Sequence, residues 1–218
     1  EAQILLIKNA KIVTMADVSY DNGYILVDEG KIKKIGENIG EIDKDILKDP
    51  CLNIINAEGK YVLPGFIDAH CHIGLWEDAV GFEGEDGNEM TDPVTPQLRA
   101  IDGIYHADRA FREARENGVT TVVTGPGSAN VIGGQFAALK TWGRRIEEMI
   151  VKEPVAMKVA FGENPKTVYN EKRQMPMTRM ATAALLRENL MKAKEYKQLW
   201  DEYNSDKEEN DKPEYDIK

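Results

Sequence analysis

The order of strand-like, loop-like and helix-like segments after residue 60 restricts the fold more than any other feature of the chain. A short apolar run at 62–67 precedes a polar, glycine-rich stretch and then a segment, 102–117, with apolar residues at helical spacing. Three further strand patterns and one long helical pattern follow, at 119–124, 136–141, 155–161 and 178–203. Strands that alternate with loops and helices are typical of parallel α/β folds. In a (β/α) barrel, polar residues that directly follow the strands would share one rim, where the chemistry takes place.

The residues before this region show a different pattern. Three short segments rich in Ile, Leu and Val lie at 4–13, 24–35 and 52–58. Turn residues lie close to them at Asp21–Gly23 and Glu29–Gly30, and strands joined by such short turns favour a small antiparallel sheet. We therefore expect an N-terminal β-domain at 1–60 and a second domain at 61–218.

Composition disfavours several classes of function. The 218 residues carry a formal net charge of -10, whereas proteins that coat nucleic-acid phosphates are usually basic. No window approaches the roughly 18 apolar residues of a membrane-spanning helix, so we expect no membrane partner. Two cysteines are too few for a disulfide scaffold and favour a reducing compartment, the cytoplasm. The acidic stretch 201–218 is expected to form a solvated loop or tail.

His70 and His72 are the strongest chemical feature of the sequence. They follow the apolar run and Asp68 directly, and residues two apart in an extended segment point to the same side. Two imidazoles on one side can bind one metal ion, and neutral imidazole nitrogen is a good ligand for Zn²⁺. Cys71, between them, points to the other side and is expected to pack. The alternative is that both histidines are ordinary polar residues near a strand end.

The segment Val62–His72 closely resembles the first-strand signature of the amidohydrolase superfamily. Gly118–Val122, Gly125–Gln135 and Phe161–Lys166 are similar to its imidazolonepropionase-like and prolidase-like branch. The resemblance implies an α/β fold, the N-terminal part of a metal-dependent (β/α)₈ TIM barrel preceded by strands of a small β-sandwich domain. It also implies hydrolysis of C–N bonds, in an amide or cyclic amide of a small molecule or dipeptide, by metal-activated water.

The same resemblance implies the ligands of a divalent metal, in the first instance one or two Zn²⁺ ions. His70 and His72 would be the first-strand ligands. The fourth-strand ligand in this superfamily is a Glu or a carboxylated Lys. Glu163, just past the strand end, is the first choice for that ligand, and Lys158, in mid-strand, is the second. The general-base Asp is expected outside this chain.

The loop after the second predicted strand supplies the candidate substrate-binding residues. Ser128, Asn130 and Gln135 could each hydrogen-bond a substrate. The alternative is that these side chains hydrogen-bond within the loop, where glycines shape the turns.

The chain departs from the superfamily pattern in its ligands and its length. Histidines after the fifth and sixth strands and an Asp after the eighth are expected, but the one other histidine, His106, lies on the predicted helix 102–117. Residues 61–218 suffice for about four strand units, whereas a complete barrel takes about 250 residues. We therefore expect an N-terminal half that ends in an acidic loop.

Open strand edges favour a partner, either the C-terminal half of the same enzyme or a homo-oligomer. The rival hypothesis is a non-catalytic barrel remnant that binds a metal or a partner.

Overall fold

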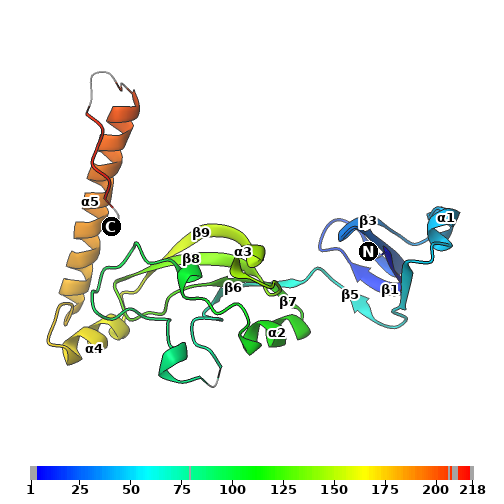
Figure 1. Ribbon diagram of the computed structural model, residues 1–218, viewed down its shortest axis with the longest axis horizontal. Helices are drawn as coiled ribbons and strands as arrows, with labels where there is room; N and C mark the ends of the chain where they lie inside the picture. Colours follow the sequence, from blue (N-terminus) through cyan, green and yellow to red (C-terminus); the bar gives the residue numbers. More distant parts are fainter. Residues whose placement is uncertain (1–3, 79, 206, 208–210, 217–218) are drawn as a thin grey trace. The chain divides into compact units, whose positions relative to one another are not determined.

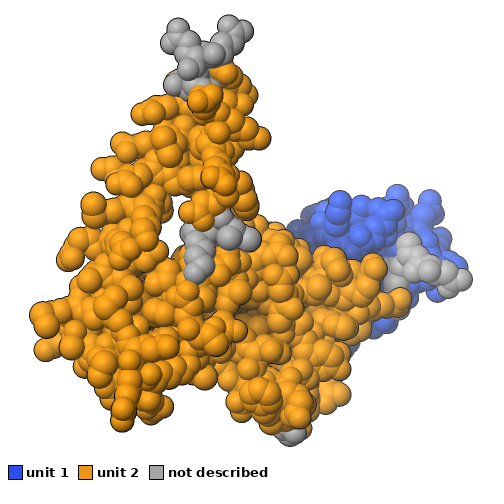
Figure 2. Space-filling view, turned by 60° about the vertical axis from the view of Figure 1, so that its left-hand side comes forward, with its two compact units in different colours: residues 1–65 blue, residues 66–218 orange. Residues whose placement is uncertain are grey.

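The computed structural model describes residues 4–78, 80–205, 207 and 211–216 (Figure 1). The chain separates into two compact units, residues 1–65 and 66–218, which Figure 2 shows in different colours. Each unit has its own sheet and its own buried core. None of the described helices combines the length and the apolar character that crossing a lipid bilayer would require.

The first unit is built around a mixed five-stranded sheet. Its elements in chain order are β1 (Ile4–Val13), β2 (Ser19–Asp28), β3 (Lys31–Gly36), η1 (Ile39–Glu41), α1 (Lys44–Leu47), β4 (Leu52–Asn56) and β5 (Tyr61–Val62). β1 pairs antiparallel with β2, which pairs antiparallel with β3, but β4 and β5 run parallel to β1. The expectation of a purely antiparallel sheet is therefore wrong. The connection through η1 and α1 is long enough to return the chain in the parallel direction.

Only one of the two predicted turns in this unit is a turn. Glu29 and Gly30 connect β2 to β3 with φ angles of 51° and 71°, and a two-residue hairpin of this kind needs positive φ at both positions. Asp21–Gly23 lies inside β2 instead, where Gly23 pairs with Ala10 of β1. The two turn signals were alike in composition, and the strand pairing decided between them.

The second unit contains a four-stranded sheet in the order β6-β7-β8-β9. The strands are β6 (Phe66–Cys71), β7 (Val119–Thr124), β8 (Ile132–Lys140) and β9 (Ile150–Val159). β6 and β7 are parallel, as predicted, but β8 runs antiparallel to both of its neighbours. The predicted all-parallel rhythm is wrong at these two pairings. Their connections, 125–131 and 141–149, are shorter than the dozen or more residues that a parallel crossover needs. The described residues thus form a mixed α/β unit and not a closed barrel.

Helices and short helical turns lie between and after these strands. They are η2 (Phe82–Gly84), η3 (Ala100–Asp102), α2 (Arg109–Glu116), α3 (Ile146–Met149), α4 (Glu163–Glu171) and α5 (Arg179–Ser205). The helix predicted over 102–117 begins only at Arg109, because Asp108 caps it and accepts a hydrogen bond from the backbone N–H of Ala110 at 3.0 Å. His106 therefore lies in the turn before α2 and not on the helix. Phe111 of α2 packs in a core with Val122 and Leu139 from the sheet.

The long helix α5 matches its prediction. The hydroxyl of Thr178 accepts a hydrogen bond from the backbone N–H of Ala181 at 3.1 Å, so Thr178 caps the helix as expected. Leu185 and Leu186 pack against a small core that includes Val131, and the remainder of α5 extends beyond the sheet (Figure 1). Of the acidic stretch 201–218, residues 201–205 continue the helix, and 206, 208–210 and 217–218 lie outside the described residues.

Candidate metal centre

His70 in β6 and His72, the residue directly after that strand, lie together at its end. The ring centroids of His70 and His72 are 5.4 Å apart and their planes are nearly perpendicular, at 79°. His70 is exposed and His72 is half-buried. The alternation of the strand therefore places both imidazoles on one side, as the sequence predicted. Cys71 is half-buried and packs against the core on the other side, also as predicted.

A backbone carbonyl orients the ring of His72. Its Nδ1 lies 2.7 Å from the carbonyl oxygen of Gly125, the first residue after β7. Ile73, the residue after His72, is also tied to β7, because the buried hydroxyl of Thr124 donates to its carbonyl at 2.8 Å. The carbonyl of Gly125 can only accept, so Nδ1 of His72 is the donor, and in the neutral ring the lone pair is then on Nε2. This is the arrangement that prepares a histidine to bind a metal through Nε2.

Lys158 from β9 completes the group around His70. Its Nζ lies 3.4 Å from Nε2 of His70 and 6.0 Å from the ring centroid of Phe136. The residue is 9% exposed, and burial lowers the pKa of its amine. Desolvation disfavours the charged form of a lysine, so the neutral amine becomes more accessible at this position.

In the described residues, Glu163 forms no hydrogen bond or ion pair with this group. It is the first residue of α4 and is exposed. In the described part of the chain, no three His, Cys, Asp or Glu side chains come together in a way that could hold a metal ion. Glu163 therefore does not complete a three-ligand set with the histidine pair in this arrangement. From the sequence, Glu163 is the first choice because it follows the predicted strand end. In the structure, the mid-strand Lys158 is the residue whose side chain reaches His70.

Two aromatic rings, those of Phe136 and Trp76, lie beside the histidine pair, and sequence reasoning missed them. The Phe136 ring centroid lies 5.5 Å from that of His70, and the Trp76 centroid lies 5.2 Å from that of His72. Two glycines fit closely against Trp76: a Cβ on Gly87 would lie 2.1 Å from the indole ring, and one on Gly127 would lie 2.8 Å from it. The glycine-rich composition of these loops was the available signal, but their contact with Trp76 is non-local.

The predicted substrate-binding residues lie in or next to the loop after β7, and the structure gives their amides internal partners. Buried Asn130 donates from Nδ2 to the carbonyl of Glu89 at 2.6 Å and to the hydroxyl of Thr95 at 2.9 Å. Its Oδ1 accepts from the Tyr169 hydroxyl at 2.6 Å. Burial raises the pKa of this phenol, so Tyr169 stays a donor. Asn130 therefore joins α4 to the loop around residues 89–95.

Gln135 and Ser128 differ in their surroundings. Gln135 is half-buried and donates from Nε2 to the carbonyl of Pro96 at 3.1 Å, so its amide is also engaged inside the protein. Ser128 is half-buried in the loop between Thr124 and Ile132. A substrate contact by Ser128, Asn130 or Gln135 stays a prediction. Of the three side chains, only that of Ser128 forms no internal hydrogen bond in the described residues.

The chain is similar to enzymes that act on C–N bonds. A crystal structure of an amidohydrolase from Thermotoga maritima MSB8 matches 98% of this chain with a TM-score of 0.85 and 42% sequence identity, and the match covers 53% of that protein. Amidohydrolase tasK of Hapsidospora irregularis is 33% identical over 172 residues, which is 72% of this chain and 17% of tasK. No model of a protein family matches the chain.

Other relatives have related names. A dihydroorotase of Fusobacterium nucleatum is 28% identical over 165 residues, 76% of this chain and 30% of the relative. A 5-methylthioadenosine/S-adenosylhomocysteine deaminase of Caldicellulosiruptor saccharolyticus is 44% identical over 71 residues, 32% of this chain and 16% of the relative. The chain thus spans about half of the solved amidohydrolase and less than a third of these curated relatives.

Proposed function

Because this chain is amidohydrolase-like in both sequence and fold, we propose that it forms part of a metal-dependent hydrolase of C–N bonds. The substrate would be an amide or a cyclic amide in a small molecule or a dipeptide. The observation that carries the proposal is the histidine pair, whose rings lie 5.4 Å apart beside a buried lysine. The similarity to amidohydrolases, dihydroorotases and deaminases supports the same reaction class.

The residues present fit a divalent metal, with Zn²⁺ as the first choice. His70 and His72 would be ligands, and the hydrogen bond from Nδ1 of His72 to Gly125 leaves Nε2 available for that purpose. Lys158 is a better third candidate than Glu163, because its Nζ already lies near His70 and its lowered pKa makes the neutral amine accessible. A neutral amine can add CO₂ and lose a proton, and the resulting carbamate is an oxygen ligand. Bound there, the metal would lower the pKa of a water molecule to about 7.

The protein's own side chains would shape the space around the reacting group. Trp76 and Phe136 flank the two histidines and would exclude bulk water from one side of the centre. Asn130 would hold the neighbouring loop in place, and Ser128 could contact the substrate. The general base is proposed to be an Asp that this chain does not supply.

The proposed architecture is a (β/α)₈ barrel to which the second unit contributes β6, β7 and β9, which run in one direction, whereas β8 between them is antiparallel. β6 and β9 form the two edges of the sheet in the described residues, and apolar side chains on both strands are exposed, including Ile67 at 69% and Val151 at 54%. Uncovered apolar edge strands favour association. We propose that the C-terminal half of the same enzyme, or a homo-oligomer, covers them. Assignment to the imidazolonepropionase-like branch and a cytoplasmic location stay predictions.

Zinc content tests the ligand assignment independently of activity. The chain is loaded with zinc, dialysed and analysed by plasma mass spectrometry, with circular dichroism as the check on folding. His70→Ala and Lys158→Met should lower the bound zinc sharply, whereas Glu163→Gln and the control His106→Ala should leave it unchanged. Loss of zinc in Glu163→Gln with retention in Lys158→Met would reverse the choice of third ligand. An unchanged zinc content in His70→Ala would refute the proposed metal centre.

Turnover separates the enzyme from the non-catalytic alternative. A zinc-loaded longer form of the protein, which includes the proposed remaining strands, is assayed against cyclic amides and dipeptides. Hydrolysis that is lost in His70→Ala supports the hydrolase. Zinc binding without hydrolysis of either class would favour the barrel remnant, which binds a metal or a partner without turnover.

A further inference from the structure

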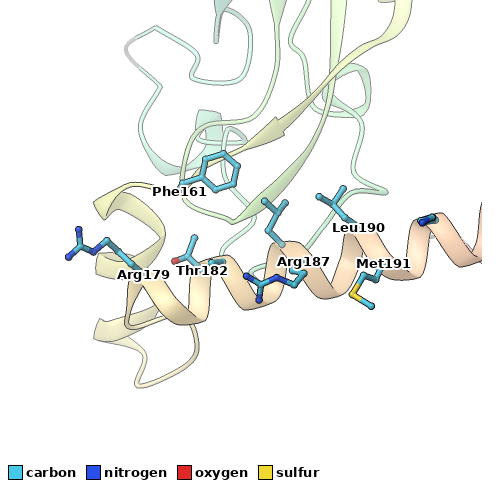
Figure 3. A pocket seen from close by; sticks show the side chains of 9 residues that line it. Phe161, Arg179, Thr182, Arg187, Leu190 and Met191 are labelled. Atoms are coloured by element: carbon cyan, nitrogen blue, oxygen red, sulfur yellow. The ribbon is translucent and has the colours of Figure 1, made fainter.

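An open groove on α5 lies outside the candidate metal centre. It has a volume of about 660 Å³ and lies between Phe161, two residues after β9, and the first four turns of α5. Figure 3 shows Phe161 reaching toward the helix, Leu190 on the same side of α5 as Phe161, and Arg187 and Met191 toward the opposite edge. Phe161, Leu190 and Met191 are each more than half exposed, at 53%, 59% and 56%. The groove therefore has an apolar floor that no described residue covers.

Every ionisable side chain that lines the groove is basic. These side chains are Arg179, Arg187 and Lys194. Among the described residues none of the three forms an ion pair, whereas two other lysines of the same helix are paired with acidic side chains, Lys192 with Glu188 and Lys197 with Asp201. Acidic residues outnumber basic ones by 38 to 28 in the chain, so carboxylates were available to pair with the groove. A cluster of three basic residues without partners is complementary to carboxylates from another molecule.

The spacing of these residues along α5 fits a second helix. Arg187 and Lys194 are seven residues apart, and Arg179 precedes Arg187 by eight, which places the three cations about 10–12 Å apart along the axis. Ala183, Leu186 and Leu190 follow one another at intervals of three and four residues. An apolar seam with this spacing, flanked by charges seven and eight residues apart, resembles the pattern of a helix that packs lengthwise against another.

We propose that the groove on α5 binds an amphipathic helix whose apolar stripe is flanked by carboxylates at seven-residue spacing. A second copy of α5 does not have this chemistry. Antiparallel copies packed about Leu190 would bring Arg187 of each copy near Lys194 of the other, and parallel copies would bring like residues together. Nucleic acid is also a poor occupant, because the groove floor is apolar and the chain carries a net charge of -10.

Peptide binding to the full 218-residue chain tests the proposal. The probe is a fluorescein-labelled helix of three heptads with Leu at positions a and d and Glu at e and g. A matched peptide carries Lys in place of each Glu. In fluorescence anisotropy the Glu peptide should bind at least about tenfold more tightly, and its binding should weaken as salt is raised. Equal binding of the two peptides would refute the proposed charge complementarity.

Paired variants locate the site. Arg187→Glu and Leu190→Asp should each weaken binding of the Glu peptide by about tenfold or more. Arg144→Glu, at an exposed site away from α5, is the charge control. Leu199→Asp is the apolar control, because Leu199 is 53% exposed and lies nine residues from Leu190, about half a turn around the helix. Both controls should bind like the wild type. Loss of binding in the controls, or a dimer in sedimentation that Arg187→Glu dissociates, would overturn the assignment.

Discussion

The contact between Trp76 and Gly87 offers a direct test of how the wall of the candidate metal centre is built. A Cβ at Gly87 would lie 2.1, 2.2 and 2.3 Å from three atoms of the indole ring. Carbon atoms in ordinary contact are about 3.5–4.0 Å apart, so Gly87→Ala requires a displacement of more than about 1 Å. Gly127 also packs against the ring and the His72 ring lies beside it, so the indole, which is 37% exposed, would have to give up these contacts to make room.

Overpacking of this kind costs about 1–3 kcal/mol. With a urea slope of about 2 kcal/mol/M, a loss of about 2 kcal/mol lowers the unfolding midpoint by about 1 M. Gly103→Ala is the matched control, since its Cβ would lie 3.3 Å from the end of the Leu75 side chain and 3.4 Å from Cβ of Asp86. The control should change stability by no more than about 0.5 kcal/mol. Equal urea midpoints for Gly87→Ala and Gly103→Ala, followed by circular dichroism, would show that Trp76 is not held as described.

Two further substitutions test buried hydrogen bonds. Tyr169→Phe removes the bond to Asn130 and should lower stability by about 1–2 kcal/mol at pH 7. Because burial raises the pKa of Tyr169, the unfolded chain ionises first above pH about 10, so the wild type should lose this advantage as pH rises. A difference between the two proteins that is the same in urea titrations at pH 7 and pH 11 would contradict this. Asp108→Ala removes the cap of α2 and the acceptor for the N–H of Gly74, and should lower stability by about 2 kcal/mol in the same assay. A loss below about 0.5 kcal/mol would show that the cap is dispensable.

Local patterns in the sequence were sufficient for several parts of this structure. A segment rich in Ile, Leu and Val predicted β1 at its observed bounds, and Thr178 predicted the start of α5. The side-chain period of two in an extended segment placed His70 and His72 together and turned Cys71 toward the core. Each of these features depends on a few consecutive residues, whose backbone geometry fixes where their side chains point.

Pairing between distant segments decided the rest. The direction of β8 depends on the lengths of two connections, and a buried strand looks the same in sequence whether its neighbours run parallel or antiparallel. The choice between Lys158 and Glu163 depends on the register of β9 against β8. The internal bonds of Asn130 depend on a loop and a helix whose residues lie about 40 positions away in the sequence. Contacts of this kind are absent from any local window. Only the packed sheet, in which buried polar atoms must find partners, determined which residues surround the histidine pair.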